Sequence, residues 1–180
     1  MGETDGPDPT HPRQTESGSP SSPGPGTSPL GSRRTCLQSS LTIPTTIVWE
    51  VQRAAWSQVG RFDRLTLELA PEGQPSDGPA RVTVEYVPPD EVAERYGVDE
   101  PTTDVAIVVA LRDGPRLAGE MHGTRASGAL RTIDIVQDLS GAPLAVLGVD
   151  GEGCYRLSVT GWDATDATAE AQLVLEIRRP

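Results

Sequence analysis

Hydrophobic and polar residues alternate along most of the chain from Thr45 onward, in short runs that end at Gly, Pro or Asp. Residues 65–69 and 82–86 each place three apolar side chains on one face and polar side chains on the other. This period of two is typical of a strand with one buried face. Residues 105–111 are apolar on both faces, which predicts a central strand covered on both sides. Further strands are predicted at residues 132–136, 144–147, 155–162 and 171–177.

The remaining elements are less regular. Residues 47–51 predict the first strand, although their apolar spacing also fits a helix. Residues 90–96 follow two prolines and end at Gly97, which predicts one short helix or turn with Asp90 as its candidate cap. About eight strands with hardly any helix predict an all-β fold: a single β-sandwich, immunoglobulin-like or jelly-roll-like, with a small barrel as the alternative.

The first part of the chain has a different composition. Pro, Gly, Ser and Thr dominate residues 2–40, and no bulky apolar residue recurs there. Such a segment cannot bury enough apolar surface to offset the entropy of ordering its backbone. We therefore predict a disordered leader over residues 1–41 and a β-sandwich domain over residues 42–180.

Charge narrows the partners that the domain can take. The chain has a net charge of −11 and a pI near 4.5. Residues 42–180 hold 22 acidic against 12 basic side chains, so almost all of this charge lies on the predicted domain. An acidic surface disfavours nucleic acid and anionic lipid, and it permits a basic protein partner. A simple role of the charge in solubility is the competing interpretation.

The residue types missing from the chain also limit the kinds of catalytic and metal site it can form. The chain has no lysine and no asparagine, and one of its two histidines, His11, lies in the predicted leader. A Schiff-base lysine, a Walker-type phosphate lysine and a cage of several histidines are therefore excluded, and we predict no cofactor and no metal. Because lysine and asparagine share A-rich codons, their joint absence indicates a GC-rich bacterial genome.

Two cysteines and the first residues bear on the cellular compartment. Cys36 lies in the predicted leader and Cys154 at the start of a strand, a spacing that indicates neither a zinc site nor a disulfide framework. Cys154 is predicted to be a small buried residue, with a reactive thiol as the alternative. The acidic, Pro-rich N-terminus lacks the order of a secretory signal, and no apolar run is long enough to span a bilayer. These observations predict a cytoplasmic protein.

His122 is the single histidine that a folded site can use, as a base, a proton switch or a metal ligand. A Ser-His-Asp triad would need Ser127 or Ser140 together with a distant aspartate, and no Gly-x-Ser-x-Gly motif supports one. The alternative, which we favour, is that His122 lies on the surface without a catalytic role.

Acidic and aromatic residues supply the other candidate sites. Asp163, Asp166 and Glu170 offer oxygen ligands for Ca²⁺, whereas a solvated polar hairpin is the competing interpretation. Asp150 and Glu152 lie at the opposite end of the strand at 155–162, so the two clusters are not expected to form one site.

The three tryptophans can be read as core or as a platform for a sugar ring. Trp49 shares a strand face with Ile47 and Val51, which predicts a role in core packing. Trp56 and Trp162 stay open as sugar-stacking residues.

One motif carries a resemblance. Asp150, Gly153, Tyr155 and Leu157 are spaced much as at the entry to the penultimate strand of immunoglobulin-like sandwiches, with one extra residue between Asp150 and Gly153. The resemblance implies that the Tyr155 hydroxyl ties back to the preceding corner. The last two strands also resemble those of small all-β proteins of GC-rich bacteria, a likeness that implies no activity.

Two functions from different classes follow. The first is a non-enzymatic protein-interaction or accessory module, of the immunity or inhibitor kind, with a basic protein partner. The second is a small carboxylate-based hydrolase or a carbohydrate-binding domain. Converging carboxylates in a concave pocket would favour the second, and a flat or convex acidic face would favour the first.

Overall fold

The structure is a computed structural model that describes residues 34–45, 47–76, 78–125, 127–162 and 169–179. It is all-β apart from one short helix, as the alternation predicted. The helix is α1 (Pro89–Tyr96). The strands are β1 (Arg34–Thr35), β2 (Ser39–Ile43), β3 (Ile47–Val59), β4 (Phe62–Pro75), β5 (Ala80–Val87), β6 (Val105–Arg112), β7 (Arg116–Leu117), β8 (Met121–Thr124), β9 (Leu130–Gln137), β10 (Pro143–Val149), β11 (Tyr155–Thr160) and β12 (Ala171–Arg178).

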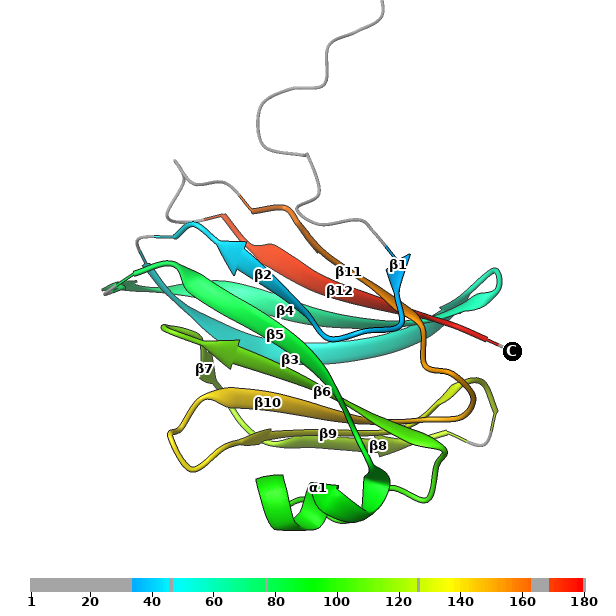
Figure 1. The fold of residues 1–180 in the computed structure, drawn as a ribbon. Helices are drawn as coiled ribbons and strands as arrows, with labels where there is room; N and C mark the ends of the chain where they lie inside the picture. The colour runs from blue at the N-terminus through cyan, green and yellow to red at the C-terminus, as the bar shows by residue number, and fades with distance from the viewer. Residues whose placement is uncertain (1–33, 46, 77, 126, 163–168, 180) are drawn as a thin grey trace, which may run out of the picture.

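Within the described ranges these strands form two six-stranded sheets that face each other as a sandwich (Figure 1). The first sheet has the order β1-β11-β12-β4-β3-β7, and the second has the order β2-β5-β6-β10-β9-β8. All neighbours are antiparallel except β3 and β7, which are parallel. The predicted number of about eight strands is too small, because β1 and the first part of β2 lie in the predicted leader, and β7 and β8 are too short to show alternation.

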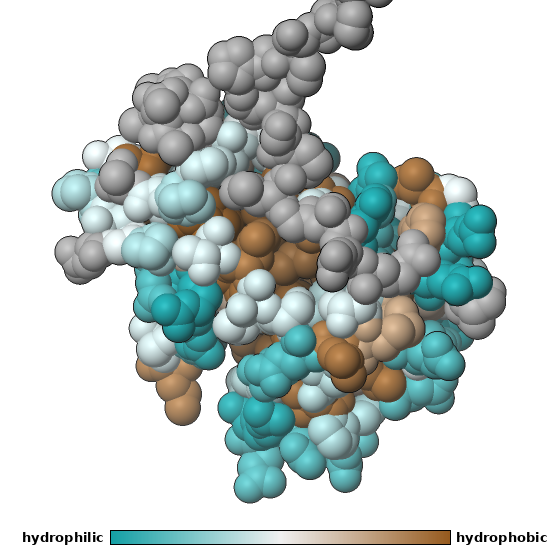
Figure 2. All heavy atoms as spheres, turned by 45° about the horizontal axis from the view of Figure 1, so that its top comes forward, coloured by the Kyte–Doolittle hydropathy of each residue, from teal (hydrophilic) through white to brown (hydrophobic). Residues whose placement is uncertain are grey.

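The main core lies between the sheets. Leu65, Leu67 and Leu69 project from β4 in the first sheet, and Val82 and Val84 project from β5 in the second sheet, all nearly inaccessible to solvent. Burial of such side chains contributes about 1.5–3 kcal/mol each relative to exposure. In Figure 2 the hydrophobic residues gather at the centre of the view, and hydrophilic residues surround them.

The prediction that residues 105–111 form a strand covered on both sides is confirmed. β6 lies between β5 and β10, and its outward residues Ala106, Val108 and Ala110 form a second apolar cluster. Val92 of α1 is fully buried in that cluster and Tyr96 packs against it. The helix begins one residue before the predicted start because Pro88 takes the cap position, and Asp90 therefore lies in the first turn and does not cap the helix.

The N-terminal boundary predicted between residues 41 and 42 is wrong. Residues 34–43, which we call the crossover segment, pair with the first sheet through β1 and with the second sheet through β2. Ile43 is buried in the main core. Residues 47–51 consequently belong to the third strand, β3, and not to the first. The prediction for residues 1–33 lies outside the described residues.

The expectation that the cysteines do not pair is also wrong. Cys36 of the crossover segment forms a disulfide with Cys154, which lies 118 residues further along the chain. Cys154 is half-buried, not a fully buried apolar residue. The physical reason is the position of β1, which pairs with the first residues of β11 and brings the two cysteines together. The Cα atoms of the two cysteines are 4.2 Å apart.

A buried carboxylate joins the two sheets at one end of the sandwich. Asp63, at the start of β4, is 1% exposed, and its Oδ2 accepts hydrogen bonds from the backbone N–H groups of Ala129 (2.5 Å) and Leu130 (3.1 Å). Gly128 has φ +108°, and a Cβ there would lie 2.6 Å from Asp63 Oδ2. Only glycine leaves room for this contact between β4 and the start of β9.

Candidate functional site

His122 lies on β8, an edge strand of the second sheet, with its side chain exposed. Its Nδ1 is 2.7 Å from Oδ1 of Asp134, and its Nε2 is 3.9 Å from Oε2 of Glu120. The hydrogen bond to Asp134 raises the pKa of His122 above its ordinary value. The positions follow from strand pairing, since His122 stands directly opposite Asp134 in the β8–β9 register.

A groove of about 160 Å³ lies beside His122, between β3 of the first sheet and the edge strand β8 of the second. Trp56 forms one wall, and a Cβ at Gly123 would approach the Trp56 ring to 3.1 Å, so the indole packs directly on the β8 backbone. The guanidinium of Arg125 lies 5.5 Å from the centre of the Trp56 ring, within the range of a cation–π contact. Met121 completes the wall on the β8 side.

The chemical capacity of this groove is limited by what stands beside His122. An Asp–His pair orients an imidazole for proton transfer, as in hydrolase triads. Ser140, one of the two predicted nucleophiles, instead donates a hydrogen bond to Asp138 Oδ1 at 2.6 Å. No hydrogen bond joins Ser127 to His122 in the part of the chain that the structure describes. The described residues thus assemble a dyad and leave the triad incomplete.

The described members of the two predicted acidic clusters have other partners or are exposed. Asp150 Oδ2 pairs with Arg131 Nε at 2.7 Å, and Glu152 Oε2 lies 3.8 Å from Cys154 Sγ. Glu170 is exposed, whereas Asp163 and Asp166 fall outside the described residues. Across the described ranges, no group of three or more His, Cys, Asp or Glu side chains is arranged to hold a metal ion.

The structure supports the prediction for Trp49 and shows where Trp56 and Trp162, which the sequence left open, lie. Trp49 is 4% exposed and donates its Nε1–H to Thr45 Oγ1 at 2.8 Å, which confirms a role in core packing. Trp162 is half-buried against the same core, at the opposite end of β11 from the disulfide. Trp56 is the one that borders a groove, and no other tryptophan lines that groove to make a stacking platform with it.

The hydroxyl of Tyr155, in the motif that resembles immunoglobulin-like sandwiches, makes different hydrogen bonds from those that the resemblance implied. The Tyr155 hydroxyl donates to the carbonyl oxygen of Leu37 at 2.9 Å and lies 2.6 Å from Ser39 Oγ. Both partners belong to the crossover segment, not to the preceding corner. The second tyrosine, Tyr86, packs against Tyr155 with ring centres 5.9 Å apart and donates its hydroxyl to the carbonyl of Gly153 at 2.8 Å.

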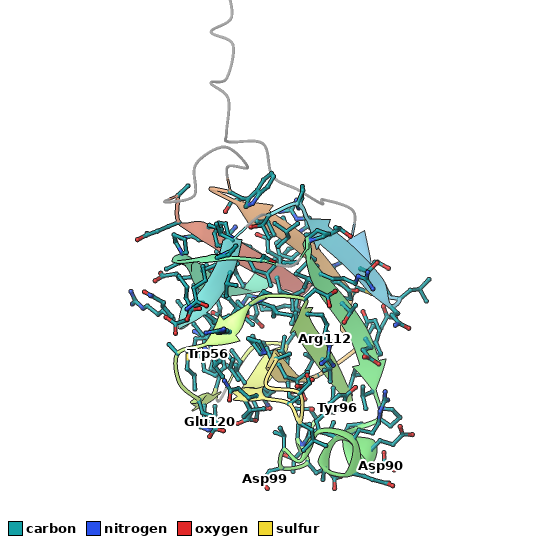
Figure 3. The ribbon with its side chains drawn as sticks, turned by 90° about the vertical axis from the view of Figure 1, so that its left-hand side faces the viewer. Trp56, Asp90, Tyr96, Asp99, Arg112 and Glu120 are labelled. Atoms are coloured by element: carbon teal, nitrogen blue, oxygen red, sulfur yellow. A yellow bond between two sulfur atoms is a disulfide. The ribbon has the colours of Figure 1, made fainter. Side chains whose placement is uncertain are left out.

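The acidic surface is concentrated around α1. Residues 85–104 carry seven carboxylates against one arginine, a net of −6 out of the −11 of the chain. Arg95 is engaged by Glu85 (3.2 Å) and Glu91 (3.6 Å). The other carboxylates are exposed and make no salt bridge to described residues; we call them the α1 ridge: Asp90, Glu94, Asp99, Glu100 and Asp104. Figure 3 shows Asp90 and Asp99 at the outer end of the molecule, away from Trp56 and Glu120.

Several carboxylates elsewhere pair with arginines on other strands. Glu176 of β12 is 5% exposed, although it points away from the core, and it pairs with Arg64 of β4 and Arg156 of β11. Burial alone would raise the pKa of Glu176, but the hydrogen bonds from both guanidinium groups outweigh this and lower it. Among the described residues, the α1 ridge is therefore the place where exposed carboxylates without a salt bridge gather.

No protein-family model matches the chain, and comparisons with curated proteins and with solved structures found no significant match. The helix in the described part of the chain is too short to cross a lipid bilayer.

Proposed function

We propose that the domain is a non-enzymatic interaction module that binds a basic protein partner through the α1 ridge. The observation that carries the proposal is the ridge itself, a set of exposed carboxylates on α1 and on the segment that follows it. The helix is anchored to the second sheet by Val92 and Tyr96. A fixed scaffold lowers the entropy lost on binding, because the carboxylates are already in place. Like charges gathered on one face also accelerate the encounter with an oppositely charged partner.

The arrangement of charge also separates the two functions proposed from the sequence. A carboxylate-based hydrolase needs two carboxyl groups converging on a substrate. The groove beside Trp56 instead brings together one histidine and Asp134, with Glu120 at 3.9 Å from the far ring nitrogen. This dyad is the observation that favours the hydrolase alternative. Replacement of His122 by Ala is its test, and we expect no loss of partner binding from that change.

The proposal is tested by neutralising the ridge. The variant Asp90→Asn, Glu94→Gln, Asp99→Asn raises the net charge by three units without touching a described salt bridge. A matched control neutralises three carboxylates elsewhere that also make no described salt bridge: Glu50→Gln, Glu152→Gln and Glu170→Gln. Each variant and the parent chain serve as bait in lysate of the source cells, and captured proteins are identified at low and high salt.

We expect basic proteins that the parent and the control retain and that the ridge variant loses. Capture should weaken as the screening length falls from about 30 Å at 0.01 M salt to about 3 Å at 1 M salt. Equal capture by all three baits, or capture that does not respond to salt, would remove the ridge from the function and leave its charge as a device for solubility.

The redox state of the Cys36–Cys154 disulfide depends on the cellular compartment of the protein. The acidic N-terminus predicted a cytoplasmic protein, and in the reducing cytosol an exposed disulfide is redox-active and not a permanent staple. An oxidising compartment would keep Cys36 and Cys154 paired at all times. Rapid alkylation of free thiols in intact cells, followed by mass spectrometry, distinguishes these compartments. A mixture of oxidised and reduced Cys36–Cys154 indicates the cytosol.

A further inference from the structure

The Cys36–Cys154 disulfide is open to solvent from one side. Cys36 is exposed, in the turn between β1 and β2, and Cys154 is half-buried directly before β11. Thiol–disulfide exchange needs an attacking thiolate to reach one of the two sulfur atoms, so access is the first requirement. The exposure of Cys36 makes its Sγ the atom that is attacked.

A hollow of about 600 Å³ adjoins the disulfide and is lined by both cysteines. This volume lies within the range of small-molecule sites, about 300–1,000 Å³. Its charged lining residues are Asp150, Glu152, Arg178 and Arg179. Asp150 also pairs with Arg131, and the Arg179 guanidinium also donates to the carbonyl of Gly60. The backbone N–H of Arg178 donates to the carbonyl of Cys154 at 3.1 Å, which fixes the backbone of Arg178 relative to the disulfide. Mixed charge of this kind complements a zwitterion better than a neutral molecule.

The disulfide is the main attachment of one part of the crossover segment. β1 pairs with β11 at only two positions, Arg34 opposite Arg156 and Thr35 opposite Tyr155. The Tyr155 hydroxyl adds the two hydrogen bonds to Leu37 and Ser39. β2, in contrast, pairs with β5 at five positions and stays attached without the disulfide. Residues 34–38 are therefore the part whose attachment depends most on the covalent bond.

We propose that Cys36–Cys154 is a thiol–disulfide exchange site for a small zwitterionic peptide thiol, and that its reduction releases residues 34–38 from the first sheet. The incoming thiolate attacks Cys36 Sγ, the bond to Cys154 Sγ breaks, and Cys154 leaves as a thiolate that takes a proton from water. A second small thiolate attacks the small-molecule sulfur of the mixed disulfide, and Cys36 leaves as a thiolate that is protonated in turn. One protein disulfide is reduced, and two small thiols are oxidised to their disulfide.

The ligand class is tested with glutathione as the zwitterionic probe and 2-mercaptoethanol as the neutral one, compared at equal thiolate concentration. We expect glutathione to reduce the full-length oxidised protein faster. Arg178→Gln should lower the glutathione rate about two- to fivefold, as expected for an exposed charge contact, and leave the 2-mercaptoethanol rate unchanged. Arg53→Gln, on β3 with its side chain 69% exposed, is the matched control that should change neither rate. Equal rates for the two thiols, or reduction by a protein dithiol alone, would overturn the assignment.

The structural consequence is tested by hydrogen exchange on the oxidised and reduced protein and on the double variant Cys36→Ser, Cys154→Ser. We expect the amides of residues 34–38 to lose protection in both disulfide-free forms, while those of β6 keep theirs. Unchanged protection of residues 34–38 would overturn the release. So would equal loss of protection in β6, because it would mean that the disulfide maintains the whole domain and not one segment.

Discussion

The replacement of Tyr155 by Phe probes the tie between the crossover segment and the rest of the sandwich. Tyr155 is fully buried, and its hydroxyl donates to Leu37 O at 2.9 Å. Since that hydroxyl has one proton, the 2.6 Å contact must be a donation from Ser39 Oγ. The Phe variant removes both hydrogen bonds, each worth about 1 kcal/mol net. Leu37 is 73% exposed, so water can bind its carbonyl, and we expect a total loss of about 2 kcal/mol in the free energy of unfolding.

The assay is equilibrium unfolding in urea with the disulfide kept oxidised. With a typical urea slope of about 2 kcal/mol per M, the midpoint should fall by about 1 M. Tyr96→Phe is the matched control, because the buried Tyr96 hydroxyl makes no hydrogen bond of normal geometry to described residues and its loss should be neutral or stabilising. Ser39→Ala in the Phe background should add little, since its partner is already gone. A Tyr155→Phe midpoint equal to that of the control would refute the reasoning.

Three further predictions concern single ionisable groups. NMR titration should place the pKa of His122 above its ordinary value, and the variant Asp134→Asn should lower that pKa. Because the pKa is raised in the folded state, the protonated histidine stabilises the fold at low pH, and this contribution is lost as pH rises through the folded-state pKa. An unchanged pKa in that variant would contradict the hydrogen bond. Burial alone would raise the pKa of Asp138, but hydrogen bonds from neighbouring residues lower it to about 2, so its stabilisation is present above the ordinary pKa of 3.8 and is lost as pH falls toward 2. Asp138→Asn should therefore flatten acid unfolding in that window, and a curve parallel to the parent would argue against the assignment. Glu176→Gln should lower the free energy of unfolding in urea by about 2 kcal/mol, because the charge-assisted hydrogen bonds from Arg64 and Arg156 weaken. A loss below about 0.5 kcal/mol would show that the arginines are held by other contacts.

Most of the sandwich was predictable because its strands carry their own signal. A strand that buries one face must alternate, and residues 65–69 and 82–86 do so without interruption. β6 breaks the alternation because α1 covers its outer face, and the run of apolar residues at 105–111 correctly predicted that cover.

The crossover segment was missed for a physical reason. Leu41 and Ile43 alternate with polar neighbours, but the run is short and follows a long Pro, Gly and Ser-rich stretch that dominates the composition. Its stability comes from partners far along the chain: β5 beside β2, and Cys154 bonded to Cys36. Neither partner is specified locally, so spacing between the two cysteines carried no information about their pairing.

The candidate groove illustrates a second limit of local reasoning. His122 was identifiable from the sequence, yet the β8–β9 register selects Asp134 as its partner. A shift of that register by one residue would place another side chain opposite His122 and remove the dyad. Trp56 comes from the other sheet, and its contact with Gly123 depends on how the two sheets are packed.

The distribution of charge over the surface depends on which charged residues lie opposite each other on neighbouring strands. The sequence predicted an acidic domain, but net charge alone does not place a binding face. In the sheets, antiparallel neighbours bring carboxylates and arginines together, as Glu176 meets Arg64 and Arg156, so these groups largely cancel. The α1 ridge has no neighbouring strand to supply arginines, and Arg95 is already shared between Glu85 and Glu91. We therefore expect the negative field to be strongest at the end of the molecule formed by α1, which is the face we propose for a basic partner.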